Sequence, residues 1–394
     1  VHKVTLEEAA VFGEFPAYDY GTYTFLDDVY PTNSDDGMEH RNSTCIVQTD
    51  DQVAGNELEL LSTYSHEYFH SWNVKRIRPK SLEPFNFAHA NMSSELWFAE
   101  GFTQYYGEML LVRAGFHTPQ EYTGVMATLI NQVLNTPGAS KYPATQMSRY
   151  SVFADAGVSI DPNNNTNIFT SYYYYGGAIA LALDLRLRAE YHLTLDDYMR
   201  AVWLALGKVM KPYTIPDLQR VLADVTKNPK FAADFFSKYI YGTDKSNYTQ
   251  LLAQAGFLLR KAQPGRAWLG QIRGLNSRNR TGQASTIGDK GLPIIYNTTQ
   301  GTPVYKAGID AGDLLLTADG RELTNLADLQ AIVNTKKPGD KLAITYKNRT
   351  GEHQTTITLE ENPTLEVVTY EAAGMPLSAE QSAFRKAWLS SKVK

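Results

Sequence analysis

The chain is poor in cysteine and has no long hydrophobic run. Cys45 is the only cysteine among 394 residues, which excludes an internal disulfide and a zinc site built on cysteine pairs. No run of eighteen or more apolar residues occurs, so the sequence predicts no membrane-spanning helix. With 43% hydrophobic and 20% charged residues, the composition is typical of a globular protein with a sizeable core.

An excess of positive charge is also missing. The formal net charge is −5 and no basic stripe dominates the sequence, so we expect no nucleic-acid partner. The short basic segment KRIRPK at residues 75–80 is interpreted as a solvated face or as a set of local ion pairs.

The first residues, VHKVTLEEAA, include neither an initiator methionine nor a signal-peptide pattern. We therefore expect that a leading segment, an N-terminal β domain, is missing from the chain, and that any export signal was lost with it. The compartment stays open, with a periplasmic or secreted location favoured over a cytoplasmic one.

Local patterns divide the chain into parts of different structure. Residues 1–50 alternate apolar and polar residues as short strands do, whereas residues 50–255 carry apolar residues at helical spacing. Beyond residue 265 the pattern becomes strands and turns, with one helix in LADLQAIVNTKKPG. The predicted fold class is multidomain α+β. The predicted boundaries are a first domain at 1–262, a β-rich domain at 263–362, and a tail with a partly ordered helix at 363–394.

The segment LSTYSHEYFHSW predicts a helix with two histidines on one face. His66 and His70 are four positions apart, and Glu67 follows the first histidine directly. Positions i and i+4 lie on the same side of a helix, so two imidazoles can reach one metal ion while Glu67 reaches a water molecule beside it. This is the HExxH arrangement of zinc peptidases. The alternative is a helix with incidental histidines.

A catalytic zinc needs a third protein ligand and an open position for water. The next predicted helix, in SSELWFAEGFTQYYGEML, offers Glu95 and Glu100. Aromatic residues flank Glu100, which predicts burial, and a buried carboxylate needs a partner such as a metal. We assign Glu100 as the third ligand and Glu95 to a supporting position near the helix start. The sequence thus predicts one catalytic Zn²⁺ per chain, with Glu67 as general base and acid.

The segments HEYFH and LWFAEGFTQYY together resemble the gluzincin metallopeptidases, in particular the aminopeptidase N group, where a W-x-x-E-G segment supplies the third ligand. The whole segment HEYFHSWNVKRIRP resembles the glycyl aminopeptidase family, whose members carry a C-terminal PDZ domain. The resemblance covers about residues 17–360. It implies a mainly helical, thermolysin-like catalytic domain with a β-rich N-terminal portion, followed by a β-rich PDZ domain.

Two further segments resemble functional segments of these families. DDGMEHRNST is similar to the exopeptidase segment, which implies that Glu39 binds the free α-amine of the substrate and that the backbone of Gly37 and Met38 aligns the peptide. SYYYYGGAIALAL is similar to the segment with a tyrosine that hydrogen-bonds the oxyanion, which implies Tyr173, with Tyr172 as the alternative register. The other interpretations are an exposed edge-strand charge for Glu39 and aromatic packing for the tyrosines.

The segments RAWLGQIRG and GTPVYKAGIDAGDLLLTADGREL resemble a bacterial, HtrA-type PDZ domain. PDZ domains bind an extended C-terminal peptide with its carboxylate on backbone N–H groups. The resemblance therefore implies a carboxylate loop at Trp268, Leu269, Gly270 and Gln271. Alternatively, the domain only packs on the first one or holds the tail of the chain.

The sequence therefore predicts a zinc aminopeptidase that removes an N-terminal residue, by resemblance Gly or Ala, from peptides with a free N-terminus. A zinc endopeptidase of the same class would not need Glu39, and a PDZ peptide-binding scaffold with a vestigial metal site would not hydrolyse peptides. The side-chain preference of the first substrate pocket, the oligomeric state and the PDZ ligand stay open.

Overall fold

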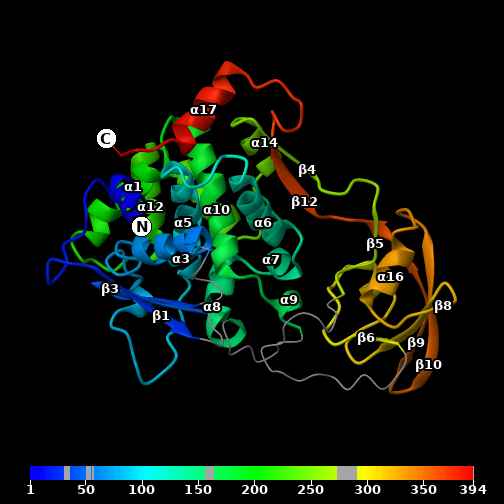
Figure 1. Cartoon of the computed structure of the whole chain (residues 1–394). Coiled ribbons are helices and arrows are strands. Elements are labelled where there is room, and N and C mark those ends of the chain that lie inside the picture. Colours follow the sequence, from blue (N-terminus) through cyan, green and yellow to red (C-terminus); the bar gives the residue numbers. More distant parts are fainter. Residues whose placement is uncertain (31–35, 50–54, 56, 156–163, 273–290, 394) are drawn as a thin grey trace.

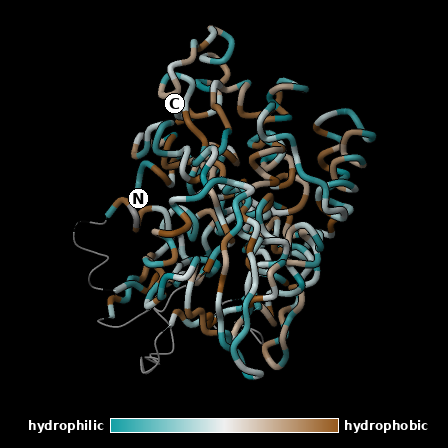
Figure 2. Tube along the Cα trace, turned by 90° about the vertical axis from the view of Figure 1, so that its right-hand side faces the viewer, coloured by the Kyte–Doolittle hydropathy of each residue, from teal (hydrophilic) through white to brown (hydrophobic). Residues whose placement is uncertain are grey.

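The computed structural model describes residues 1–30, 36–49, 55, 57–155, 164–272 and 291–393. Figure 1 shows a helical body with a small sheet below it and a β-rich domain to one side. Figure 2 shows hydrophobic segments, in brown, running through the interior of the molecule. The architecture is the multidomain α+β fold that the sequence predicts. No helix among the described residues is both long and apolar enough to cross a membrane.

A three-stranded sheet packs on the helical body next to helix α3 (Glu57–Phe69). Its strands follow the order β1-β3-β2, and they are β1 (Thr24–Tyr30), β2 (Asp36–Glu39) and β3 (Ser43–Thr49). Strand β3 runs parallel to β1 and antiparallel to β2. Alternate residues of β3 are buried, as expected for a strand with one face on the core. These strands were predicted from the alternation in the first fifty residues.

The same prediction is wrong for the first residues of the chain, which form helix α1 (His2–Phe12). The segment LEEAAVF is rich in good helix formers, and Val4, Val11 and Phe12 recur on one buried face at helical spacing. The helix ends at Gly13, whose φ of 84° is a left-handed conformation that glycine adopts without strain.

Residues 57–253 are mainly helical, as predicted. Thr194 forms a capping box with Asp197 at the start of α11, and Thr118 and Glu121 exchange hydrogen bonds just before α6. The helices after α3 are α4 (Leu96–Ala99), α5 (Gly101–Arg113), α6 (Tyr122–Leu134), α7 (Pro137–Lys141), α8 (Ala144–Ala154), α9 (Asn165–Ile168), α10 (Tyr172–Arg186), α11 (Leu195–Val202), α12 (Ile215–Thr226), α13 (Pro229–Phe235) and α14 (Tyr248–Ala253), with π-helical turns at Leu187–Tyr191, Trp203–Gly207 and Phe236–Ile240 and a 3₁₀ turn at Lys80–Leu82.

Glycines allow α4, α5 and α10 to cross in close contact. A Cβ atom on Gly176 would lie 1.8 Å from the carbonyl oxygen of Trp97, and one on Gly101 would lie 2.3 Å from the Gly176 Cα. Only glycine fits at both positions. The crossing therefore fixes Glu100, which lies between α4 and α5, against the helix that begins with Tyr172 and Tyr173.

The second domain is a small β-rich unit with its own core. Its main sheet has the order β10-β9-β7-β6, with β8 beside β7, and helices α15 and α16 pack with it. The helix predicted in LADLQAIVNTKKPG is α16. The elements are β5 (Ala267–Trp268), β6 (Leu292–Pro293), α15 (Pro303–Lys306), β7 (Leu314–Ala318), β8 (Arg321–Glu322), α16 (Leu326–Val333), β9 (Lys341–Asn348), β10 (Gly351–Thr358) and β11 (Glu360–Glu361), which pairs with β5.

The chain returns from the second domain to the helical body. Strand β4 (Phe257–Lys261) pairs antiparallel with β12 (Leu365–Thr369), so the β-rich domain is inserted between two paired strands. The segment 363–394, expected as a tail, continues into helix α17 (Ala379–Leu389). The backbone N–H of Lys392 donates to Glu7 of α1 at 3.0 Å. Both ends of the described chain thus lie on the side of the body away from the inserted domain (Figure 1).

Helix α17 contributes a fully buried tryptophan to the core of the helical body. Trp388 is 0% exposed, and its Nε1 donates to the Tyr105 hydroxyl at 2.9 Å. We expect Trp388→Ala to lower the free energy of unfolding by about 3–5 kcal/mol, as for other buried aromatic residues. Phe384→Ala, on the same helix but only partly buried, should cost less. Urea unfolding of both variants measures this, and a Trp388→Ala protein as stable as the wild type would show that the tail is not part of the core.

Candidate active site

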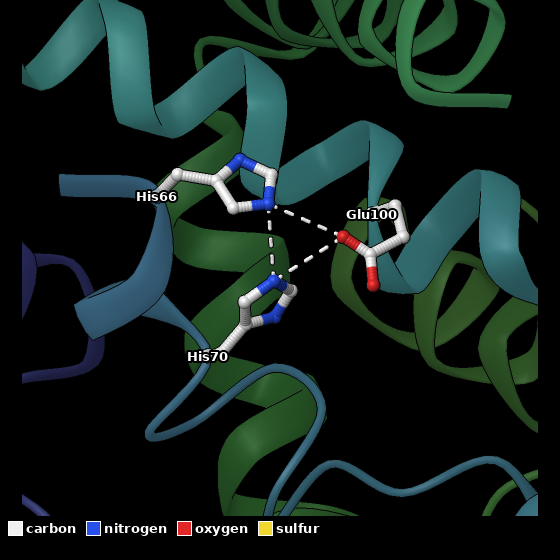
Figure 3. Close-up of side chains that lie close together, drawn as sticks. All are labelled: His66, His70 and Glu100. Atoms are coloured by element: carbon white, nitrogen blue, oxygen red, sulfur yellow. Dashed lines mark hydrogen bonds and ion pairs between the residues drawn. The ribbon is translucent and has the colours of Figure 1, made fainter. Parts of the chain in front are cut away.

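His66 and His70 come together at the end of α3. His66 lies in its last turn and His70 directly follows it, and the two Nε2 atoms are 3.1 Å apart (Figure 3). The Nδ1 of His70 lies 2.6 Å from the Asn73 carbonyl oxygen. A proton on Nδ1 donated to that carbonyl leaves Nε2 as the free lone pair that a metal requires.

Glu100 faces the two histidines from the junction between α4 and α5. Its Oε2 lies 3.2 Å from the Nε2 of His66 and 3.2 Å from the Nε2 of His70 (Figure 3). Burial alone would raise the pKa of the Glu100 carboxyl, but His70 and His66 hold it well below its usual range. Burial would likewise lower the pKa of His70, but Glu100 raises it to about 10. The Glu100 carboxyl is therefore ionised at neutral pH, as a metal ligand must be.

The three atoms have the spacing of metal ligands. Two ligands of a tetrahedral zinc at bond lengths near 2.0–2.1 Å lie about 3.3 Å apart, and the three separations here are 3.1–3.2 Å. Two imidazoles and one carboxylate are also the donor set of a catalytic zinc site. Among the described residues His66, His70 and Glu100 thus fit one divalent ion. They leave its fourth position to the substrate or to water.

Glu67 lies beside this cluster under the edge strand β2. A Cβ atom on Gly37 would lie 2.1 Å from the Glu67 Oε1, so only glycine lets the strand pass so closely over the carboxyl. Thr44 Oγ1 lies 3.5 Å from the Glu67 Oε2. Burial raises the pKa of Glu67, and the two histidines partly oppose this rise. The carboxyl therefore lies in a confined position next to the open coordination position of the metal. Its raised pKa makes it a stronger base than an exposed carboxylate.

Glu39 belongs to the same cluster of acids and histidine. One carboxylate oxygen each of Glu39 and Glu67 and one nitrogen of His70 lie within 4.8 Å of one another. The Nζ of Lys75 lies 2.9 Å from the Glu39 Oε1, and both side chains are less than one fifth exposed. Burial would raise the pKa of Glu39, but His70 and Lys75 hold it below its usual value. Glu39 is therefore an anion next to the metal ligands. Met38 contributes its carbonyl oxygen to Thr44 Oγ1 at 3.1 Å.

Tyr173 faces the cluster, whereas the hydroxyl of Tyr172 is used elsewhere. The Tyr173 ring lies 5.8 Å from the His66 ring between centroids. Tyr172 stacks on Tyr173 and donates its hydroxyl to Asp155. The Glu100 carboxylate and burial raise the pKa of Tyr173, so its phenol stays protonated and can donate a hydrogen bond. Of the two registers that the sequence leaves open, the geometry favours Tyr173.

A cleft of about 850 Å³ opens over His66, Glu67 and Tyr173. It is bordered by β2 and β3 on one side and by α3, α5 and α10 on the others. Its lining includes Gly37, Val47, His66, Glu67, Gln104 and Tyr173. The cleft has room for a peptide beside the metal ligands.

Two residues of the site were not identified from the sequence. Asn73 Nδ2 donates to the carbonyl oxygens of Phe98 and Ala99 at 3.0 and 3.2 Å, and so ties the histidine turn to the segment that presents Glu100. Lys75 belongs to the basic segment that was interpreted as a solvated face or local ion pairs, yet its partner is Glu39 of the site. No local pattern could reveal either contact, because the partners are 25 and 36 positions away.

Glu95, the other candidate acid of this segment, lies apart from the cluster. Its Oε2 accepts hydrogen bonds from Ser81 Oγ at 2.7 Å and from Ser93 Oγ at 2.8 Å. Glu95 directly precedes α4, and its bonds to the two serines fix the start of that helix. The sequence predicted a supporting position near the helix start for Glu95.

The predicted carboxylate loop lies in the second domain next to α15. The N–H of Val304 donates to the Leu269 carbonyl oxygen at 2.7 Å. Gly270 has a φ of 122°, and a Cβ atom there would lie 2.9 Å from Thr302 Oγ1. Trp268 pairs with Glu360 of β11. The loop therefore has a glycine-dependent turn at the position expected for it.

Two parts of the chain match known protein families, and the whole chain has a similar solved structure. Residues 59–179 match the family model of the M61 glycyl aminopeptidases, and residues 274–359 match the PDZ domain model. An aminopeptidase N family protein from Idiomarina loihiensis has a similar structure, with a TM-score of 0.79, 25% identity, and coverage of 98% of this chain and 65% of that chain. This chain thus spans just under two thirds of that relative. No curated protein matches the chain.

Two less similar structures are an M1 zinc metallopeptidase from Deinococcus radiodurans and the HtrA-type protease AlgW with decapeptide. The first has a TM-score of 0.39 at 14% identity and covers 62% of this chain and 44% of that chain. The second has a TM-score of 0.21 at 22% identity and covers 25% of this chain and 30% of that chain. Residues 59–179 are thus similar to the M61 glycyl aminopeptidases, and residues 274–359 are similar to PDZ domains.

Proposed function

We propose that the protein is a zinc-dependent aminopeptidase that removes the N-terminal residue, Gly or Ala, from peptides. The observation that carries the proposal is the convergence of His66, His70 and Glu100 within 3.2 Å, next to a confined Glu67 and an ionised Glu39. The match to the glycyl aminopeptidase model supports the preference for a small first residue.

The zinc ion held by His66, His70 and Glu100 would supply Lewis acidity, which polarises the scissile carbonyl and lowers the pKa of a water molecule to about 7. Glu67 would take a proton on one carboxylate oxygen from the water whose oxygen bonds to the scissile carbonyl carbon, and would give it to the amine nitrogen as the C–N bond breaks. Tyr173 donates its hydroxyl hydrogen to the oxygen that becomes negative. Glu39 holds the α-ammonium of the substrate and so limits cleavage to the first peptide bond.

The proposed binding of the substrate's α-ammonium group by Glu39 is tested with the variant Glu39→Gln. Two substrates are used, glycyl p-nitroanilide and its N-acetylated analogue. The wild type should hydrolyse only the free amine. The variant keeps the shape of the side chain but loses its charge, and we expect kcat/KM for the free amine to fall about ten- to a hundredfold, mainly through KM. Steady-state kinetics measures the effect.

His117→Gln is the matched control, because His117 borders the same cleft and takes no part in the proposed chemistry. Its kinetics should stay near those of the wild type. Equal hydrolysis of the acetylated and free substrates by the wild type would contradict the aminopeptidase assignment and favour the endopeptidase alternative.

The oxyanion donor is tested with Tyr173→Phe, which removes a single hydroxyl. We expect kcat to fall about 10²–10³-fold with little change in KM, because the hydrogen bond forms fully only in the transition state. Tyr172→Phe is the matched control, since it removes the neighbouring hydroxyl that is bonded to Asp155. A larger loss in Tyr172→Phe than in Tyr173→Phe would assign the role to the other register.

A further inference from the structure

The active-site cleft leads away from Glu39. Its described lining residues include Asp36, three positions earlier on β2, but not Glu39 itself. On α3 the lining reaches from Glu67 back to Leu58, whereas Glu39 groups with His70, which directly follows the end of that helix. A peptide with its amine on Glu39 therefore has its first residue at the metal ligands and its later residues in the cleft.

Helix α5 forms part of one wall of the cleft and presents two side chains to it. All of its thirteen residues are buried except Gln104 and Glu108, and both of these line the cleft. They follow Glu100 by one and two helical turns, or about 6 and 12 Å. Glu108 accepts a hydrogen bond from Ser62 Oγ of α3 at 2.7 Å. The side-chain amide of Gln104 has no hydrogen-bond partner among the residues that the structure describes.

A second free amide reaches the cleft from strand β3. Gln48 lines the cleft and is only 7% exposed, on the same face of the strand as the buried Thr44 and Ile46. A strand position that faces the core usually holds an apolar side chain, because a buried amide without a partner costs free energy. Gln48 has no side-chain partner in the described part of the chain, so its amide is available to a ligand in the cleft.

The positions of the two amides match the main chain of an extended substrate. Strand β2 pairs antiparallel with β3 so that Glu39 lies opposite Thr44. Gln48 lies four strand positions, or about 13 Å, beyond Thr44. An extended peptide advances about 3.3 Å per residue. A peptide held by Glu39 therefore passes Gln104 near its second residue and Gln48 near its third or fourth residue.

The chemistry of the cleft suits an uncharged main chain. A glutamine side chain offers one acceptor and two donors, which complement the N–H and C=O groups of a peptide. No lysine or arginine is among the described lining residues. The free carboxylate of a dipeptide would therefore find no cation there, whereas the interior of a longer peptide carries no such charge.

We propose that Gln48 and Gln104 hydrogen-bond the main chain of the substrate beyond its first peptide bond, so that the protein acts on peptides of about four residues or more in preference to dipeptides and glycyl anilides. This inference rests on the proposed function, because Glu39 and the metal ligands set the direction of the peptide. Both glutamines contact the departing part of the substrate and not the reacting atoms. A p-nitroanilide has no peptide groups there, so its hydrolysis uses neither glutamine.

The test compares Gly-Ala-Ala-Ala-amide with glycyl p-nitroanilide on the zinc-loaded full-length chain. Gln104→Met and Gln48→Leu keep the approximate size of each side chain and remove its amide. We expect each variant to lose about tenfold in kcat/KM for the tetrapeptide amide, mainly through KM, and to stay within about twofold for the anilide. Chromatography of released glycine and the absorbance of p-nitroaniline measure the two reactions.

Gln132→Met is the matched control, because Gln132 is a partly buried glutamine of α6 outside this cleft. It should leave the hydrolysis of both substrates unchanged. Gln48→Leu should unfold at a temperature no lower than that of the wild type, since the lost amide makes no bond within the chain. Equal losses on both substrates would give the glutamines a structural role, and no loss on either would exclude contact with the substrate. Each result would overturn the inference.

Calorimetric titration of the Glu67→Gln protein with the tetrapeptide amide separates this inference from the proposed function, because it needs no turnover. Adding Gln104→Met or Gln48→Leu to that protein should raise Kd about tenfold, and an unchanged Kd in both would overturn the inference. A wild type that hydrolyses neither substrate, together with a Kd raised by both substitutions, would contradict the peptidase function and still support the peptide contacts.

Discussion

Glu67→Gln is expected to keep the metal and to lose turnover by roughly 10²–10⁴-fold, the usual contribution of a general base. The amide has the size of the carboxyl, which matters because Gly37 passes directly over it. It cannot accept the proton of the attacking water. His66, His70 and Glu100 are untouched, so metal content should stay at one ion per chain. Hydrolysis of glycyl p-nitroanilide and elemental analysis measure the two quantities separately.

Glu108→Gln is the matched control for this experiment. Glu108 borders the same cleft and accepts a hydrogen bond from Ser62 Oγ at 2.7 Å, but it is not among the groups that cluster at the metal site. Its turnover should remain close to that of the wild type. Wild-type turnover in Glu67→Gln with full metal content would show that another group is the base.

Glu100→Gln is expected to release the metal and to reduce hydrolysis to the level of the metal-stripped protein. Catalytic zinc sites use three protein ligands, and this substitution leaves two imidazoles and a neutral amide. The Glu100 carboxyl, which is only 14% exposed, also balances the positive charge of the site, since its pKa is held low by the histidines. Dialysis followed by elemental analysis should find far less than one ion per chain, with an unchanged circular dichroism spectrum.

Glu95→Gln is the matched control for Glu100→Gln, because it removes a buried acid of the same segment that is not a proposed metal ligand. Glu95 lies five positions earlier, is 9% exposed, and bonds Ser81 and Ser93. Its replacement should lower stability but preserve metal content and turnover. Retention of one ion per chain by Glu100→Gln would remove Glu100 from the ligand set.

Local sequence patterns predicted most residues of the candidate site. The i and i+4 spacing of His66 and His70 follows from helix geometry, and the aromatic neighbours of Glu100 predicted its burial. The capping box of Thr194 and Asp197 likewise lies within one short segment. These features depend on residues within a few positions of one another, which is why the sequence alone reveals them.

The features that the sequence did not reveal depend on distant contacts. Asn73 and Lys75 have ordinary local contexts, and their roles come from contacts with the segments at Phe98 and Glu39. The packing of Trp388 against Tyr105 joins residues 283 positions apart. Helix α1 was missed because the alternation typical of the later strands was extended over a segment of helix formers.

The most direct test of the account is a crystal structure of the zinc-loaded protein with anomalous diffraction data collected on both sides of the zinc absorption edge. A zinc ion at this site should give one peak above the edge, about 2.0–2.2 Å from the Nε2 atoms of His66 and His70 and from a carboxylate oxygen of Glu100, and the peak should disappear below the edge. A map without a peak there, or a peak with the Glu100 carboxylate turned away from both rings, would contradict the assignment of the metal site and the peptidase mechanism that depends on it.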